Sequence, residues 1–107
     1  MIREALNGEI PGTGDRGEFR RVVVEEGEVT GYIACSRLDG SPFIHDLAYE
    51  GPDPSMVAAL VQAARKQVKA WGFDEVFCNV MADNVGLAAL LMARGFEPVQ
   101  VVFKGLV

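Results

Sequence analysis

The chain has little of what a metal site or a disulfide framework requires. It contains a single histidine, His45, and two cysteines, Cys35 and Cys78, which lie far apart in apolar, strand-like segments. These three residues do not make up a metal-binding set, and cysteines in such segments are typical of buried free thiols in a reducing compartment. No cation flanks Cys78 to activate its thiol, so we expect a small packed apolar residue rather than a nucleophile.

Basic residues and long apolar segments are also scarce. Lysine and arginine number 10 against 15 acidic residues, and the net charge of −5 argues against a nucleic-acid backbone as a partner. The N-terminal segment MIREALNGEI lacks the apolar run of a signal peptide, and no segment is long and apolar enough to span a membrane. We therefore expect one cytoplasmic domain over residues 1–107, without membrane partners.

Segments rich in β-forming residues, separated by turn residues, make up the first half of the sequence. Glu26-Gly27 and Asp39-Gly40-Ser41-Pro42 are turn signals between apolar runs, a pattern typical of antiparallel hairpins. Residues 8–18 have the glycine-rich composition of a loop. The four strands are predicted at Ile2 to Leu6, Arg21 to Glu26, Val29 to Arg37 and Phe43 to Tyr49.

A helical period replaces the alternating pattern in the second half. From Val57 to Trp71 the apolar residues recur every three or four positions, with Asp53 or Ser55 as a cap and Gly72 at the end. The remaining elements are predicted as a strand from Glu75 to Met81, a helix that begins at Asn84, and a strand from Phe96 to Lys104. The order β-β-β-β-α-β-α-β predicts an α+β (α/β-like) fold, in which two helices pack on a sheet of about six strands.

The segment from Asn84 to Phe96 is the most informative part of the sequence. Its asparagine can cap a helix, its leucines form one apolar stripe, and Gly95 suits a left-handed position at the helix end. This order and spacing resembles the closing motif of the GNAT-superfamily N-acetyltransferases, and the similarity extends over nearly the whole chain. The resemblance implies a mixed, mostly antiparallel sheet, acetyl-CoA as cofactor and an amine as acceptor.

The resemblance also implies where the chemistry would take place. In the family a backbone N–H late in the fourth strand polarises the thioester carbonyl, and by position this is the N–H of Leu47. His45 precedes it by two residues, so we expect both on one face of the strand and consider His45 a candidate general base. The alternative is a hydrogen-bonded structural histidine. Asn84 corresponds to a contact with the pantetheine arm, and Tyr49 is taken as a further cofactor contact.

Three features depart from the family pattern. The family's cofactor loop has an Arg/Gln-x-x-Gly-x-Gly/Ala pattern, whereas this chain has Pro52-Asp53-Pro54-Ser55-Met56-Val57, with two prolines that lack an N–H and an added negative charge. The N–H groups of Ser55, Met56 and Val57 remain as candidate anion donors, so we expect a low affinity for acetyl-CoA. Leu91 lies where the family often has a tyrosine whose hydroxyl protonates the CoA thiolate. Residues 7–20 are too few to form the two helices that the family has between its first and second strands.

Two interpretations of the function follow. The first is an acetyl-CoA-dependent N-acetyltransferase with an unidentified amine acceptor, and the second is an inactive GNAT-fold interaction module that has lost efficient cofactor binding. A third, weaker interpretation is a cleft for a larger acyl group or a small ligand other than CoA. The apolar run Val101-Val102-Phe103 in the last predicted strand also suggests pairing with a second copy or another protein.

Overall fold

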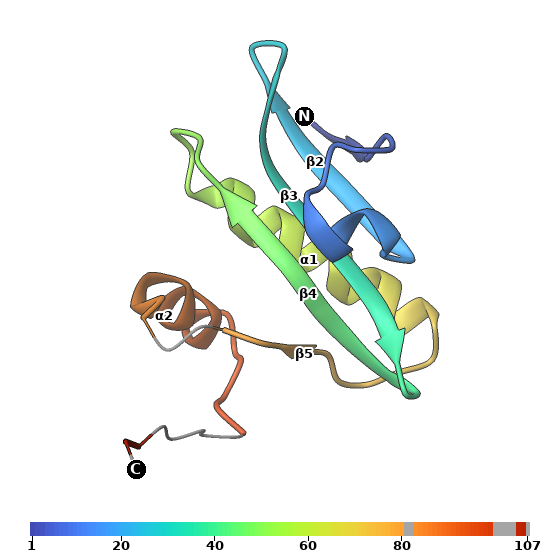
Figure 1. The fold of residues 1–107 in the computed structure, drawn as a ribbon, viewed down its shortest axis with the longest axis vertical. Coiled ribbons are helices and arrows are strands. Elements are labelled where there is room, and N and C mark those ends of the chain that lie inside the picture. Colours follow the sequence, from blue (N-terminus) through green and yellow to red (C-terminus); the bar gives the residue numbers. More distant parts are fainter. Residues whose placement is uncertain (81–82, 100–104, 107) are drawn as a thin grey trace.

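The part of the chain that the structure describes forms a five-stranded sheet, two α-helices and one 3-10 turn (Figure 1). The computed structural model describes residues 1–80, 83–99 and 105–106. The elements are β1 (Ile2–Glu4), η1 (Gly12–Arg16), β2 (Phe19–Glu25), β3 (Glu28–Leu38), β4 (Ser41–Tyr49), α1 (Ser55–Ala70), β5 (Phe77–Cys78) and α2 (Val85–Ala93). The strands lie in sequence order, with β1 to β4 antiparallel and β5 parallel to β4. This confirms the predicted α+β class and the predicted order of strands and helices from β1 to α2.

Two tight turns produce the predicted hairpins. Glu26 and Gly27 have φ angles of 51° and 80° between β2 and β3, and Asp39 and Gly40 have the same pair of values between β3 and β4. Positive φ at both central residues defines the type I′ turn, whose twist matches that of antiparallel strands. Both hairpins therefore follow from local turn chemistry that the sequence displays.

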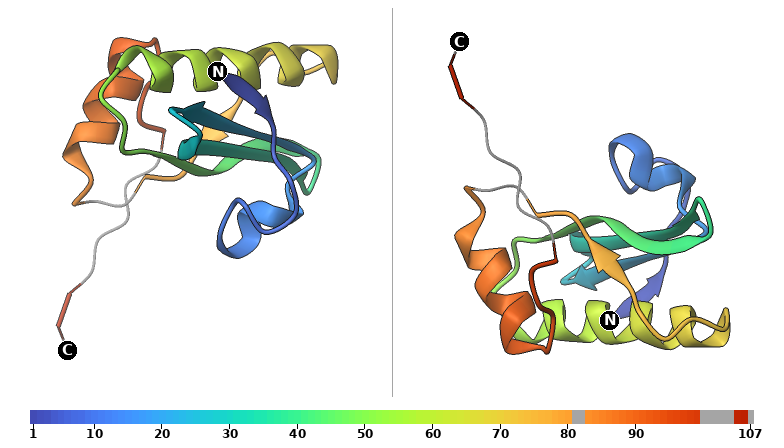
Figure 2. Two further views of the ribbon diagram at one scale, coloured as in Figure 1. Left: turned by 90° about the horizontal axis from the view of Figure 1, so that it is seen from above. Right: turned by 90° about the horizontal axis from the view of Figure 1, so that it is seen from below.

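The two faces of the sheet are covered unequally (Figure 2). Helix α1 lies along one face, where it buries Leu60, Ala64 and Val68 against strand residues such as Ile33 and Ile44. On the other face, η1 and the chain before it cover only a part of the sheet. The buried cluster on this side is small and comprises Ala5, Ile10, Val22 and Ala34. Among the described residues, no helix has the length and apolar character needed to cross a membrane.

Helix α2 has the two ends that the sequence predicts. At its start the Asn84 side-chain oxygen accepts a hydrogen bond of 3.2 Å from the N–H of Leu87. At its end Gly95 has a φ of 89°, its N–H donates to the Met92 oxygen, and the N–H of Phe96 donates to the Leu91 oxygen. These paired bonds satisfy carbonyl groups that a helix end leaves free, and only a glycine adopts the required conformation without strain.

Several predicted strands are shorter than expected. Strand β1 ends at Glu4, and β5 contains only Phe77 and Cys78, because its pairing with β4 stops after two residues. Residues 96–99 form no strand, while residues 100–104 of the predicted last strand and Met81 lie outside the described residues. The described part of the sheet therefore has five strands rather than about six. The loop over residues 8–18 includes the 3-10 turn η1, which the sequence did not indicate.

Acid is expected to weaken the protein through Glu9, which joins the loop after β1 to that strand. Arg3 donates to both carboxylate oxygens of Glu9 at 2.8 Å, and the Leu6 N–H adds a third bond; these contacts hold the pKa of Glu9 at about 2, below the usual 4.5. Because the pKa is depressed in the folded state, the stabilisation is present above pH 4.5 and is lost as the pH falls toward 2. Urea unfolding across this range should show a smaller acid-dependent loss of stability for Glu9→Gln than for wild type. The exposed Glu26→Gln is the control, and equal acid sensitivity of all three proteins would contradict the assignment.

Candidate functional site

A bulge in β4 determines which side chains face each side of the sheet. The register pairs Ala34 with Asp46 and Cys35 with Ile44, so His45 is an extra residue in β4. The bulge interrupts the alternation of side chains, and Leu47 consequently packs with Ile44 on the face that α1 covers. The prediction that His45 and Leu47 share a face is therefore wrong.

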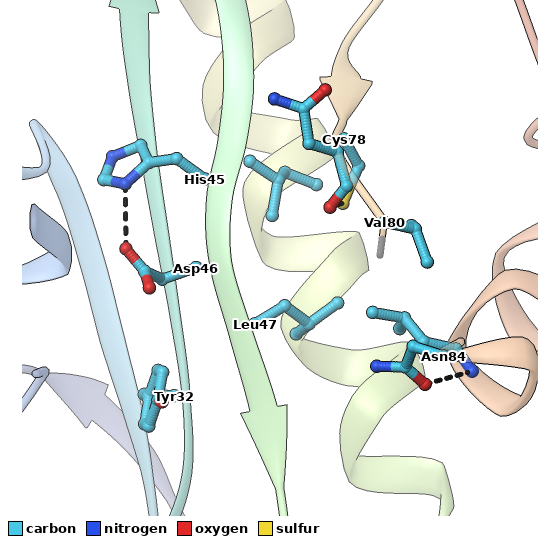
Figure 3. A pocket seen from close by; sticks show the side chains of 10 residues that line it. Tyr32, His45, Asp46, Leu47, Cys78, Val80 and Asn84 are labelled. Atoms are coloured by element: carbon cyan, nitrogen blue, oxygen red, sulfur yellow. Dashed lines mark hydrogen bonds and ion pairs between the residues drawn. The ribbon is translucent and has the colours of Figure 1, made fainter. Parts of the chain in front are cut away.

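His45 and Asp46 instead both lie on the face that carries η1. A methyl group added at Gly14 of η1 would lie 2.9 Å from Asp46 Oδ2, which shows how closely η1 approaches this carboxylate. The side chain of His45 bonds to Asp46 and to Ser36, a residue of β3 on the same face. In Figure 3 the His45 and Asp46 side chains extend to one side of β4, and the Leu47 side chain extends to the other.

A cleft opens where β4 and β5 separate. Their pairing covers only Phe43 with Phe77 and Ile44 with Cys78, and beyond it the two strands diverge. The cleft has a volume of about 180 Å³. Residues of β3, β4, β5 and α2 line it, among them His45, Asp46 and Leu47 of β4, Val80 after β5, and Asn84 and Leu87 at the start of α2 (Figure 3).

The backbone N–H of Leu47 points into this cleft. Antiparallel strands are hydrogen-bonded through alternate residues, so successive N–H groups point to opposite edges of a strand. The N–H of Glu50 donates to the Thr30 oxygen of β3 at 2.8 Å, and the register continues with Ala48 opposite Tyr32. The N–H of Leu47 therefore points away from β3, to the edge where β4 and β5 separate.

Hydrogen bonds engage both ring nitrogens of His45. Nδ1 lies 3.0 Å from Asp46 Oδ2, and Nε2 lies 2.9 Å from the Ser36 hydroxyl oxygen. Ser36 is 9% exposed, and its oxygen also accepts a bond of 3.4 Å from the Glu18 N–H. No signal in the sequence points to Ser36, because only the pairing of β3 with the bulged β4 brings it to the histidine.

Tyr49 anchors the loop that leads from β4 into α1. Its hydroxyl donates to Glu25 Oε2 at 3.2 Å and accepts a bond of 2.8 Å from the N–H of Asp53. Its ring packs against the core on the α1 face, and burial is the main cause that raises the pKa of its hydroxyl. This tyrosine, predicted as a cofactor contact, is thus engaged in holding the loop.

The side chain of Asp53 occupies the start of α1, where the sequence placed anion donors. Its Oδ1 accepts hydrogen bonds from the Ser55 N–H at 3.0 Å and the Ser55 hydroxyl at 2.7 Å, and the Met56 N–H donates to the Asp53 main-chain oxygen at 3.0 Å. The Ser55 contacts lower the pKa of Asp53, so its carboxylate is charged at neutral pH. Two of the three predicted donors, those of Ser55 and Met56, are therefore already paired. The third, on Val57, belongs to the first turn of α1, whose start carries the negative charge of Asp53.

The remaining candidate groups offer no acid or nucleophile. Leu91 is buried and lies outside the cleft lining. Burial raises the pKa of both the Cys35 and the Cys78 thiols to about 11, which keeps them protonated and unreactive near neutral pH. Within residues 1–80, 83–99 and 105–106, no cluster of histidine, cysteine and acidic side chains has a composition and spacing that could hold a metal ion.

Comparisons with known proteins give matches among solved structures only. No protein-family model matches the sequence, and no curated protein matches it significantly. The ribosomal-protein-S18-alanine N-acetyltransferase from Escherichia coli superposes with a TM-score of 0.69 at 14% identity, over 94% of this chain and 79% of that one. Aminoglycoside N-acetyltransferase AAC(6')-Iy in complex with CoA gives a TM-score of 0.68 at 17% identity, over 82% and 65% of the two chains. The apo aminoglycoside 6'-N-acetyltransferase AAC(6')-IG from Acinetobacter haemolyticus superposes with a TM-score of 0.64 at 14% identity, over 83% of this chain and 70% of that one.

Proposed function

Since the chain has the fold of the GNAT N-acetyltransferases, we propose that it transfers an acetyl group from acetyl-CoA to an amine. The observation that carries this proposal is the cleft between β4 and β5, with the N–H of Leu47 directed into it. A backbone N–H at this position would donate to the thioester oxygen as negative charge develops on it. Such preorganised donors supply a large share of the catalysis of acyl transfer.

The geometry supports a direction of attack. The Leu47 N–H lies in the plane of the sheet, and His45 extends from the face that carries η1. With the thioester between the strands, the amine approaches from the η1 face, where His45 takes up its proton as general base. The neutral amine nitrogen then bonds to the carbonyl carbon, the carbon–sulfur bond breaks, and the proton that the new amide nitrogen loses passes through water to the departing thiolate.

The size of the cleft fits one end of the cofactor. A volume of about 180 Å³ is below the ~300–1,000 Å³ typical of pockets that enclose a whole drug-sized ligand. It suits the acetyl thioester and the adjoining part of the pantetheine arm, with Asn84 at its edge. The nucleotide end would lie toward the start of α1, where the charge of Asp53 opposes it. We therefore infer that acetyl-CoA binds weakly and mainly through its thioester end.

Binding and turnover test the proposal separately. Acetyl-CoA at 100 times its dissociation constant should stabilise the protein by ~2.7 kcal/mol, which is an increase of several degrees in Tm for a domain of this size. Release of the CoA thiol in the presence of a panel of primary amines measures transfer. His45→Ala should reduce turnover and leave the Tm shift in place. The absence of both a Tm shift and thiol release at millimolar acetyl-CoA would refute the proposal.

One observation favours a second candidate function, an inactive interaction module with this fold. The Asp53 carboxylate holds the position at the start of α1 where a pyrophosphate would need free N–H donors. A chain that had lost cofactor binding would retain the sheet, the cleft and α2 but show no response to acetyl-CoA. The same melting experiment therefore distinguishes the two functions.

A further inference from the structure

We propose that a hollow beside the β3–β4 turn binds a lysine or arginine side chain, and that the acceptor is a peptide that carries this side chain. The inference rests on the proposed function, because it specifies the class of amine that the reaction takes. The hollow has a volume of about 260 Å³ and lies between the turn and the connection from α1 to β5. It is separate from the cleft, since Phe77 of β5 lines the hollow and Cys78 lines the cleft.

Aromatic rings and carboxylates line the hollow together. Phe73 and Phe77 contribute rings, and Pro42 at the start of β4 is apolar and buried. Asp74 and Glu75, both exposed, contribute the carboxylates. The ion pairs found among the described residues all involve other acidic side chains, so no neighbouring cation in that part of the chain balances these two charges.

The cation closest in the strand register, Arg37, is engaged elsewhere. Arg37 lies opposite Pro42 in the pairing of β3 with β4. Its guanidinium donates to Glu18 Oε1 at 2.6 Å and lies 4.7 Å from the centroid of the Trp71 ring. The positive charge of Arg37 is thus paired with Glu18, and the hollow keeps its negative charge.

A cation on an apolar stem matches this lining. Lysine and arginine side chains cover apolar surface with their stems, and the face of an aromatic ring attracts their charged ends. The described residues contain no group of three histidine, cysteine or acidic side chains that could hold a metal ion. A phosphate backbone is repelled by the carboxylates and by the net charge of −5. The charge of the hollow therefore selects a basic side chain.

Two stacked rings connect the hollow with the face from which the amine approaches. Ile44 packs on the α1 face, so the preceding residue Phe43 lies on the opposite face, which also carries His45. Phe43 pairs with Phe77 of β5, and their ring centroids lie 5.4 Å apart. Both residues are only half-buried. The rings therefore offer a partly exposed apolar surface between the hollow and His45.

The spacing along β4 favours a peptide over a small amine. Ser41 lines the hollow and His45 lines the cleft, four positions further along the strand, which is a separation of ~13 Å. The volume of about 260 Å³ is below the ~300–1,000 Å³ of pockets that enclose a whole drug-sized ligand, so the hollow suits a single side chain. An extended peptide whose basic residue follows the amine by about four residues reaches both places, whereas a small amine reaches only one.

Binding of a blocked peptide tests the hollow without turnover. The probe is an N-acetylated, C-amidated peptide of alanine and glycine with an arginine in its fifth position, and its counterpart has glutamine there. Titration calorimetry at low salt should show about tenfold tighter binding of the arginine peptide to wild type, because an aromatic face and exposed carboxylates each contribute a part. Equal affinities of the two peptides would overturn the site.

Two double variants locate the effect. Asp74→Asn with Glu75→Gln should abolish the preference for arginine. Glu26→Gln with Glu28→Gln, in the exposed β2–β3 turn, removes the same charge and should preserve the preference. The same loss in both double variants would mean that net charge, rather than the hollow, attracts the peptide.

Turnover of the unblocked peptide tests whether the hollow serves the acceptor. Asp74→Asn with Glu75→Gln should raise the KM for the arginine peptide about tenfold and leave kcat unchanged, because the hollow holds a part of the acceptor that does not react. The KM for ethylamine should not change, and arginine moved to the second position should give no advantage over glutamine. Wild-type protein that acetylates ethylamine as efficiently as the arginine peptide contradicts a peptide acceptor. Wild-type protein that acetylates no amine refutes the proposed function instead, and the binding of the blocked peptide then decides the docking site independently.

Discussion

Replacing Asp53 with alanine is expected to tighten the binding of coenzyme A about tenfold, because the change removes a negative charge from the start of α1. The carboxylate of Asp53 accepts two hydrogen bonds from Ser55, and those bonds lower its pKa and keep it ionised. Without the side chain, the Ser55 N–H becomes free to bind an anion. The start of α1 then regains both a donor and a favourable helix dipole.

A second substitution separates the two contributions. Asp53→Asn removes the charge but keeps a side-chain oxygen that caps the Ser55 N–H, so its gain in affinity should be smaller than that of alanine. Titration calorimetry at low salt measures the affinity of both variants for coenzyme A. The gain in affinity over wild type should decrease as added salt screens the charge. Asp74→Asn, beyond the other end of α1, is the control for net charge.

A ligand control makes this result specific for the pyrophosphate. Pantetheine has the thiol arm of coenzyme A and lacks the nucleotide diphosphate, so its affinity should be the same for wild type and both Asp53 variants. Equal gains for pantetheine and coenzyme A would place the effect of Asp53 elsewhere in the cleft. Unchanged affinity for coenzyme A would show that its diphosphate does not approach α1.

Truncation of Leu60 is expected to have the largest effect on stability. Leu60 of α1 is fully buried against the sheet, within the cluster that includes Ile33 and Ile44. Leu60→Ala should lower the free energy of unfolding by about 2–5 kcal/mol, through lost burial and the cavity left behind. Domains of this size are stable by only about 5–15 kcal/mol, so the loss is a large share of the total. Urea unfolding measures it.

The neighbouring residue Gln62 provides a matched control in the same helix. Its side chain is exposed, and alanine is a better helix former than glutamine, so Gln62→Ala should change the stability by less than about 0.5 kcal/mol. A comparable loss in both variants would mean that the burial of Leu60 is not what sets the stability of α1. A small loss in Leu60→Ala would mean that the sheet holds together without the cluster beneath α1.

Features that depend on neighbouring residues in the chain could be predicted from the sequence. Both hairpin turns followed from Glu26-Gly27 and Asp39-Gly40, and the cap at Asn84 and the left-handed Gly95 followed from helix-end chemistry. In each case a few consecutive residues contain the whole physical cause.

Features set by pairing between distant strands could not be predicted in the same way. The extra residue in β4 has no local signal, since alternation from His45 to Leu47 is equally compatible with a regular strand. Because of the bulge, the side chain of His45 lies on the opposite face of the sheet from that of Leu47, and it contacts Ser36. Likewise, the paired state of the Ser55 and Met56 N–H groups depends on how Asp53 folds back onto the helix. The structure places the predicted residues His45, Leu47 and Asn84 around one cleft, but the sheet faces of these residues and their bonding partners could be obtained only from the structure.

The order of the strands in the sheet also bears on how the chain folds. Strands β1 to β4 each pair with the next strand in sequence, so these contacts close short loops and can form early. The pairing of β5 with β4 is the parallel one, and it requires the chain to pass through the whole of α1 first. It therefore carries the highest loop-closure entropy in the described sheet. The cleft exists only after this step, so binding of a ligand there would select chains that have completed folding and would slow their unfolding.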